Sequence, residues 1–258
     1  MEENTENIKR PSFLYWGSEI GRAIAEMGIS FPFRKFYNSE EKGDGHTILV
    51  LPGFMSSDVS TAPLRNFVGK LGYDSQGWEL GRNYAKVEFL DKLIERIEDL
   101  YKKSGEQITL IGWSLGGVFA RQLAKERPHM IRQIITLGSP FMGVNKANNA
   151  AWLYNILVKR ETIEEAAPEL IKEFPKPAPV PTTAIYTKED GIVPWQLCLE
   201  KEETYFHQNI QVRGSHLGLG FNPSVLKIIA DRLKYKEANW VPFEPDSFFD
   251  DLVLYPSL

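Results

Sequence analysis

The sequence is poor in the features that mark several common classes of protein. Its 258 residues include one cysteine, Cys198, so an internal disulfide is excluded and a cysteine-based zinc site is not expected. No apolar run approaches the roughly 20 residues that span a bilayer. The polar, acidic start lacks the basic and apolar parts of a signal peptide. We therefore expect a cytoplasmic protein.

The chain also lacks a positive charge that would attract nucleic acid. Its formal net charge is -4, and Lys and Arg are mixed with Asp and Glu rather than gathered into a basic block. No phosphate-binding loop, no dinucleotide-binding glycine pattern after a strand and no metal-binding H-E-x-x-H spacing occurs. We expect no nucleic-acid partner, no cofactor and no metal site.

What the sequence does contain is an alternation of short β-branched runs with longer helical patterns. Strands are predicted over 47–51, 107–113, 131–138, 181–187 and 209–214, and helices over 61–72, 84–103, 115–127 and 224–233. This alternation predicts an α/β fold, with a mostly parallel central sheet and helices on both faces. In such sheets the functional groups gather at the carboxyl ends of the strands.

Three regions are predicted around this pattern: an N-terminal extension (1–43), a core (44–236) and a C-terminal tail (237–258). Within the core, residues 144 to about 180 are long for a simple crossover and predict a small helical lid, although an ordinary crossover helix with a long loop also fits. The acidic, aromatic tail either packs on the body or contacts a partner.

The N-terminal extension carries an amphipathic helical pattern. Its apolar positions, spaced three or four residues apart, are Phe13, Trp16, Ile20, Ile24 and Met27. We expect this face to pack against the body. The alternative is contact of residues 13–27 with a membrane surface, although Glu19 and Glu26 weigh against anionic lipid.

One stretch, I-G-W-S-L-G-G (111–117), carries chemistry. It follows a predicted strand and opens a helix at once, which is the context of the G-x-S-x-G nucleophile elbow, here Gly112, Ser114 and Gly116. The helix N-terminus below the serine favours a developing oxyanion. Ser114 is therefore the candidate nucleophile, and the alternative is a tight turn with a small residue.

A serine nucleophile needs a base and an acid, which in this architecture follow it in the order acid and then histidine. Asp190 lies at the exit of the strand 181–187 and precedes a glycine, so it is preferred over the neighbouring Glu189. His216 lies in a glycine-rich loop after the last strand and is the candidate base. The other histidines do not fit this order: His46, His129 and His207.

An oxyanion hole would need two backbone N–H donors. Leu115 follows the nucleophile and would supply one. The loop after the strand 47–51 would supply the other, from Phe54 or alternatively from Met55, with Gly53 allowing the backbone to turn sharply. An ordinary strand-to-helix loop remains the alternative.

The motifs L-P-G-F, I-G-W-S-L-G-G, L-G-S-P-F-M-G, D-G-I-V-P and G-S-H resemble those of the α/β-hydrolase superfamily. The resemblance covers residues 45 to 235 and is to the lipase and esterase branch that includes relatives of the GPI-inositol deacylases. It implies a serine hydrolase that cleaves a carboxylic ester of an acyl or lipid-like substrate. Two departures stand out: Pro52-Gly53 replaces a common His-Gly pair, and only 31–37 suggests a remnant of the strands that often come first.

An apolar pocket is expected beside these motifs, lined by Met55, Trp113, Phe141, Met142, Trp152 and Leu217. Its ligand would be a small-molecule ester with an apolar acyl group. Two alternatives to ester hydrolysis stay open. An acyltransferase would use the same triad, and a non-catalytic protein of this fold would only bind a ligand or partner. The sequence does not indicate the oligomeric state.

Overall fold

A computed structural model of the chain describes residues 8–36, 42–142, 168–201, 203–246 and 254–256. Its centre is a six-stranded sheet in the order β2-β1-β3-β4-β5-β6, with every neighbouring pair parallel. The strands are β1 (Thr47–Leu51), β2 (Asp74–Gly77), β3 (Ile108–Trp113), β4 (Ile131–Leu137), β5 (Thr182–Tyr186) and β6 (His207–Gln211). The predicted α/β fold is confirmed.

Burial explains which strands the sequence pattern revealed. Strands β1, β3, β4 and β5 are buried along their whole length, as near-continuous apolar strands of a parallel sheet should be. The strand that the sequence analysis missed, β2, has the sequence D-S-Q-G and pairs only with β1 at the sheet edge. An edge strand of four largely polar residues has no hydrophobic periodicity to detect.

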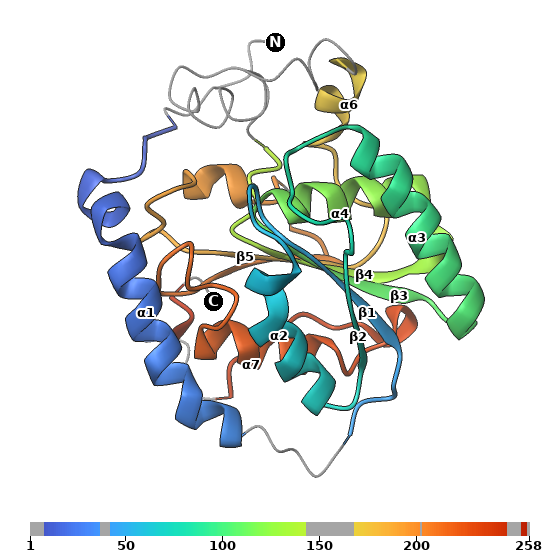
Figure 1. Cartoon of the computed structure of the whole chain (residues 1–258), viewed down its shortest axis with the longest axis horizontal. Coiled ribbons are helices and arrows are strands. Elements are labelled where there is room, and N and C mark those ends of the chain that lie inside the picture. Colours follow the sequence, from blue (N-terminus) through green and yellow to red (C-terminus); the bar gives the residue numbers. More distant parts are fainter. Residues whose placement is uncertain (1–7, 37–41, 143–167, 202, 247–253, 257–258) are drawn as a thin grey trace.

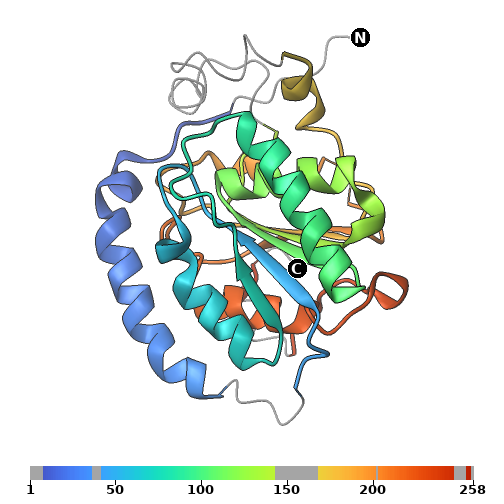
Figure 2. The same ribbon diagram turned by 45° about the vertical axis from the view of Figure 1, so that its right-hand side comes forward.

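Helices cover both faces of the sheet (Figure 1). The side chains of α3 (Glu88–Ser104) and α4 (Leu115–Glu126) build the core on one face. Those of α2 (Asp58–Lys70) and α7 (Pro223–Arg232) build it on the other. Helix α1 (Phe13–Phe36) lies along the outer edge of the molecule in both views (Figures 1 and 2) and contacts α7. None of the described helices is long and apolar enough to cross a membrane.

The N-terminal helix differs from prediction in two ways. Residues 31–36 continue α1, so the interpretation of 31–37 as a remnant strand is wrong. The apolar face also does not pack on the body: Trp16, Ile20 and Ile24 are 62%, 69% and 60% exposed. What faces the body instead is the polar side of the helix, with Glu19 buried.

Parts of the C-terminal tail and of the insertion pack on the core, which the sequence pattern had not decided. Phe243 and Tyr255 of the tail are buried beside α7, with ring centroids 5.1 Å apart, so this part of the tail packs on the body. In the insertion, α6 (Pro168–Glu173) is followed by an extended segment that buries Ala178 and Val180. The rest of the predicted lid, residues 144–167, lies outside the described residues.

A buried ion pair ties α4 to the segment between β5 and β6. Arg121 donates both terminal guanidinium nitrogens to the Glu200 carboxylate and one of them also to the Lys176 carbonyl, 2.9 Å away. Both side chains are at most 3% exposed. Burial lowers the pKa of Arg121, while the charge and hydrogen bonds of Glu200 oppose that shift. Glu200 therefore supplies the counter-charge that the buried guanidinium needs.

Truncating Glu200 should therefore destabilise the fold strongly. Glu200→Ala leaves a buried guanidinium without its counter-charge, and we expect the free energy of unfolding in urea to fall by about 3–5 kcal/mol. Glu79→Ala is the control, because Glu79 is 63% exposed in its ion pair with Arg96 and water screens that pair. Equal losses in the two variants would show that the buried pair contributes no more than a surface one.

Candidate active site

Ser114 stands at an abrupt reversal between β3 and α4. The strand ends at Trp113, the helix begins at Leu115, and Ser114 alone makes the turn. Its φ of 51° and ψ of -122° lie outside the regions that non-glycine residues prefer. Such a conformation costs on the order of 1–3 kcal/mol and persists only where surrounding packing enforces it.

The neighbouring glycines make this reversal sterically feasible. A Cβ on Gly112 would overlap the backbone of Gly117, and a Cβ on Gly116 would overlap the carbonyl of Leu51 in β1. The helix is thus packed directly onto the strands. This is the reason that the sequence needs glycine on either side of the serine.

The predicted acid and base are paired. The Nδ1 of His216 lies 2.6 Å from Oδ2 of Asp190. The other oxygen of Asp190 accepts the backbone N–H groups of Ile192 and Val193 at 2.7 Å and 2.6 Å. Both side chains are buried. A carboxylate held in this way fixes the imidazole ring through Nδ1 and leaves Nε2 available for proton transfer.

Electrostatics around His216 favour its protonated form. Burial lowers its pKa, but the charge and hydrogen bond of Asp190 and the charge of Glu19 outweigh burial, and the pKa is raised above its usual value. The neutral imidazole, which is the form that accepts a proton, is therefore lost as the pH falls through this raised pKa.

The competing acid and histidines have other partners. Glu189 accepts the backbone N–H of Gly214 at 3.1 Å rather than contacting His216. His207 lies 2.9 Å from the carbonyl of Ala178. His129 stacks edge-on against Tyr101, and His46 lies at the opposite end of the sheet.

The loops that carry the candidate nucleophile, acid and base lie together at the carboxyl ends of the strands. The Ser114 N–H donates to the carbonyl of Leu137 at the end of β4 (2.8 Å). The indole of Trp113 donates to the carbonyl of His216 (3.1 Å). Gly138 lies against the His216 ring, since a Cβ there would come within 3.0 Å of Nδ1. The carboxyl ends of four neighbouring strands thus bring these residues together, as the topology requires.

The loop after β1 lies beside the serine and is held by Asn83, which is fully buried. A Cβ on Gly53 would come within 3.2 Å of the Ser114 Cβ. Asn83 donates to the carbonyl of Pro52 (2.9 Å), and its own carbonyl accepts the N–H of Met55 (2.7 Å). Because the Met55 amide is occupied, the structure favours Phe54 over Met55 as the oxyanion donor. Within the part of the chain that the structure describes, the Phe54 and Leu115 amides donate to no protein acceptor.

The predicted pocket residues fall into three groups. Trp113 and Phe141 are buried in the core. Met55 and Leu217 are exposed, and Met142 is partly buried. Trp152 lies outside the described residues.

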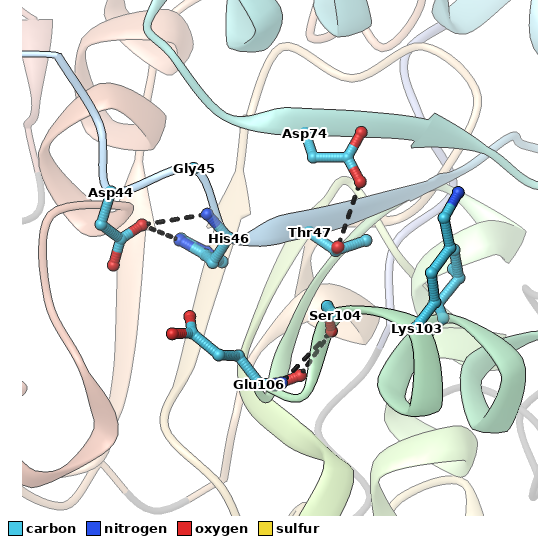
Figure 3. Close-up of a pocket in the computed structure, with 9 residues that line it drawn as sticks. Asp44, Gly45, His46, Thr47, Asp74, Lys103, Ser104 and Glu106 are labelled. Carbon is cyan, nitrogen blue, oxygen red and sulfur yellow. Dashed lines mark hydrogen bonds and ion pairs between the residues drawn. The ribbon is translucent and has the colours of Figure 1, made fainter.

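A cavity of about 340 Å³ lies at the opposite end of the strands from Ser114, beside the amino ends of β1 and β2 (Figure 3). His46 there lies between Asp44 (2.5 Å) and Thr109 (2.9 Å), and burial lowers its pKa. Its two ring nitrogens are thus engaged in the protein. Among the described residues, no group of three His, Cys, Asp or Glu could hold a metal ion.

Sequence reasoning missed four residues whose buried contacts fix the loops and the helix of the candidate active site: Glu19, Glu26, Asn83 and Arg121. Only Glu19 and Glu26 left a signal. With Arg22 they are the only charged residues from Phe13 to Ile29, and they recur on one helical face.

Known proteins share this fold. The family model described as "PGAP1-like alpha/beta domain" matches residues 73–165, which include Ser114 but end before Asp190. A search of curated proteins by sequence found no match. Structurally, Aspergillus fumigatus lipase B superposes with a TM-score of 0.59 at 19% identity over 81% of this chain. The chain has the α/β-hydrolase fold.

Two further structures share the α/β-hydrolase fold. A metagenome-derived lipolytic enzyme has a TM-score of 0.55 at 16% identity and covers 74% of this chain and 93% of its own. An α/β superfamily hydrolase from Oenococcus oeni PSU-1 has a TM-score of 0.53 at 14% identity, covering 75% and 94%. By contrast, this chain spans 56% of the Aspergillus lipase.

The Asp190 contact predicts a specific change in the titration of His216. Asp190→Asn removes the negative charge that raises the pKa of His216, so we expect that pKa to fall. Histidine proton NMR across a pH series measures it, with the His216 signal assigned from a His216→Gln spectrum. A pKa that stays at the wild-type value would show that Asp190 is not the source of the shift.

Proposed function

We propose that the protein is a serine hydrolase that cleaves carboxylic esters through an acyl-enzyme on Ser114. The observation that carries the proposal is the Asp190–His216 pair, buried at the same sheet edge as the strained Ser114. A buried carboxylate–imidazole pair and a serine at an elbow between strand and helix are the parts that nucleophilic acyl transfer needs. Structural similarity to proteins described as a lipase and a lipolytic enzyme supports the same reaction class.

The proposed reaction has two halves. The Oγ of Ser114 attacks the ester carbonyl carbon while Nε2 of His216 takes the hydroxyl proton. The oxyanion of the tetrahedral intermediate accepts the N–H groups of Phe54 and Leu115. Collapse expels the alcohol, which receives the proton from His216, and leaves the acyl group on Ser114. Water, deprotonated by His216, then releases the carboxylic acid by the same steps.

Asp190 and the raised pKa of His216 fit these roles. Asp190 holds the Nδ1 proton and stabilises the imidazolium that forms when His216 accepts a proton. Because the neutral ring is the base, activity should decline as the pH falls through the raised pKa of His216. The exposed Met55 and Leu217 beside the site suit a small-molecule ester with an apolar acyl group.

The test is covalent labelling with a fluorophosphonate probe, in which Oγ of Ser114 displaces fluoride from phosphorus. We expect wild-type protein to be labelled and Ser114→Ala and His216→Ala to lose labelling, each by at least about 10³-fold because neither residue acts without the other. His207→Ala is the matched control and should label like wild type. An acyl-ester series of rising chain length would then define the substrate.

Three results would contradict the proposal in different ways. Absence of labelling in folded wild type would exclude an activated serine and favour the non-catalytic alternative. Labelling that survives Ser114→Ala would place the nucleophile elsewhere. Labelling without ester hydrolysis, but with acyl transfer to an added alcohol or thiol, would favour the acyltransferase.

A further inference from the structure

Helix α1 presses its charged side into the two catalytic loops. Oε1 of Glu19 accepts the backbone N–H of Gly191 (2.8 Å) and of His216 (3.2 Å), and Oε2 accepts that of Leu217 (3.0 Å). Glu19 is 3% exposed. One buried carboxylate therefore joins the residue after the proposed acid to the proposed base itself.

The close approach of α1 depends on glycine in both loops. A Cβ on Gly191 would overlap the helix backbone at Tyr15 and Trp16, and a Cβ on Gly218 would overlap the Glu26 carboxylate. Glu26 lies about two turns further along the same face of the helix. Its carboxylate accepts the Ser215 N–H at 2.7 Å and so makes a second contact with the loop. The glycine-rich loop around His216 is thus shaped to receive α1.

We propose that Glu19 is a positioning residue that sets the placement of Asp190 relative to His216 through the backbone of both loops. Charge-assisted hydrogen bonds from a buried carboxylate are strong and directional, which suits this task. Only the expected effect of Glu19 on activity rests on the proposed function. Its effect on the Asp190–His216 pair can be measured without substrate, through the pKa of His216.

The charges around His216 set the pH response of this arrangement. Asp190 contacts the ring, and Glu19 adds a second negative charge. Charged groups on the elements packed around the loop include Glu19, Arg22 and Glu26 on α1, Lys188, Glu189 and Asp190 on the acid loop, and Arg213 at the loop start. Arg22 pairs with Glu19 at 2.9 Å and partly offsets its charge.

The test compares Glu19→Gln with Glu26→Gln. Both variants remove a carboxylate from the same helix face, but only Glu19 touches His216 and acts on its charge. We expect Glu19→Gln to lower the pKa of His216 in NMR titration and to slow fluorophosphonate labelling on the order of 10–100-fold, as a small misplacement does. Glu26→Gln should leave that pKa unchanged.

Arg22→Met keeps the proposal testable if Glu19→Gln does not fold. It removes the cation that offsets Glu19, so the pKa of His216 should rise. Equal pKa values in wild type, Glu19→Gln and Arg22→Met would overturn the proposal, and equal effects of Glu19→Gln and Glu26→Gln would reduce it to helix docking. Neither result resembles failure of the proposed function, which is absence of labelling in wild type.

The opposite face of α1 carries an independent observation. Every residue of α1 from Phe13 to Ile29 that is exposed is apolar, aromatic or glycine. Glu19 and Glu26 bind the loops of the body, and the partly exposed Arg22 pairs with Glu19. Large exposed side chains on this face include Phe13, Leu14, Trp16, Ile20 and Ile24. Contiguous exposed apolar surface of this kind marks an interaction site.

We infer that this face docks on a lipid surface. The exposed Lys9 and Arg10 just before the helix would meet phosphate headgroups, and no acidic side chain is exposed between Phe13 and Ile29 to repel them. Tyr15 and Trp16 have the amphipathic rings that favour a membrane–water interface. Since the Trp16 backbone packs against Gly191, docking would bring the catalytic loops to the phase where an apolar ester dissolves.

Vesicle flotation tests this docking. Wild type should float with vesicles of phosphatidylcholine mixed with phosphatidylserine, and Ile20→Gln/Ile24→Gln should lose partitioning on the order of 10–100-fold as apolar area is removed. Val59→Gln is the control, because Val59 is 82% exposed on α2, away from this face.

Two outcomes would overturn the docking inference. Wild type that does not float would exclude a lipid partner. Wild type that is a dimer in solution, and that Ile20→Gln/Ile24→Gln converts to a monomer, would assign the face to a second copy of the chain. Fluorophosphonate labelling of the same variants in detergent-free buffer should be unchanged, so failure here is distinct from failure of the catalytic proposal.

Discussion

The structure depends on one tight steric constraint, the reversal of the chain at Ser114. Helix α4 is packed so closely on β3 and on the end of β1 that Gly112 and Gly116 have no room for a Cβ. Because Ser114 alone makes the turn, its backbone is held in a conformation that packing must enforce. The buried strands and the helix packed on them supply that packing.

The order of the strands decides what surrounds the serine. The chain runs from β1 out to β2 and then returns to place β3 on the other side of β1, so the loops after β1 and β3 flank a topological switch point. Phe54 and Ser114 come from these two loops. Asp190 and His216 follow strands further along the sheet, and parallel pairing places the loops that carry all four residues at the same end of the sheet.

Helix α1 shows how tertiary structure can invert a sequence pattern. An amphipathic helix is usually assumed to turn its apolar face inward, because burial of apolar area is the dominant gain. Here the loops it covers expose backbone N–H groups at Gly191, Ser215, His216 and Leu217, and two carboxylates satisfy them. Each of these donors would cost about 1–3 kcal/mol if it were buried without a partner.

The sequence by itself determined the fold and the candidate triad. Buried parallel strands have dense β-branched runs, the elbow needs its glycines, and an acid and a histidine after later strands must reach the same edge. Tertiary structure alone decided what has no local signature. The polar edge strand β2, the hold of Asn83 on the Phe54 loop and the burial of Glu19 against the loops each depend on partners distant in sequence. Local periodicity in the sequence reflects which residues are buried. These hydrogen bonds instead join polar groups that come close only after the sheet has formed, so no local pattern predicts them.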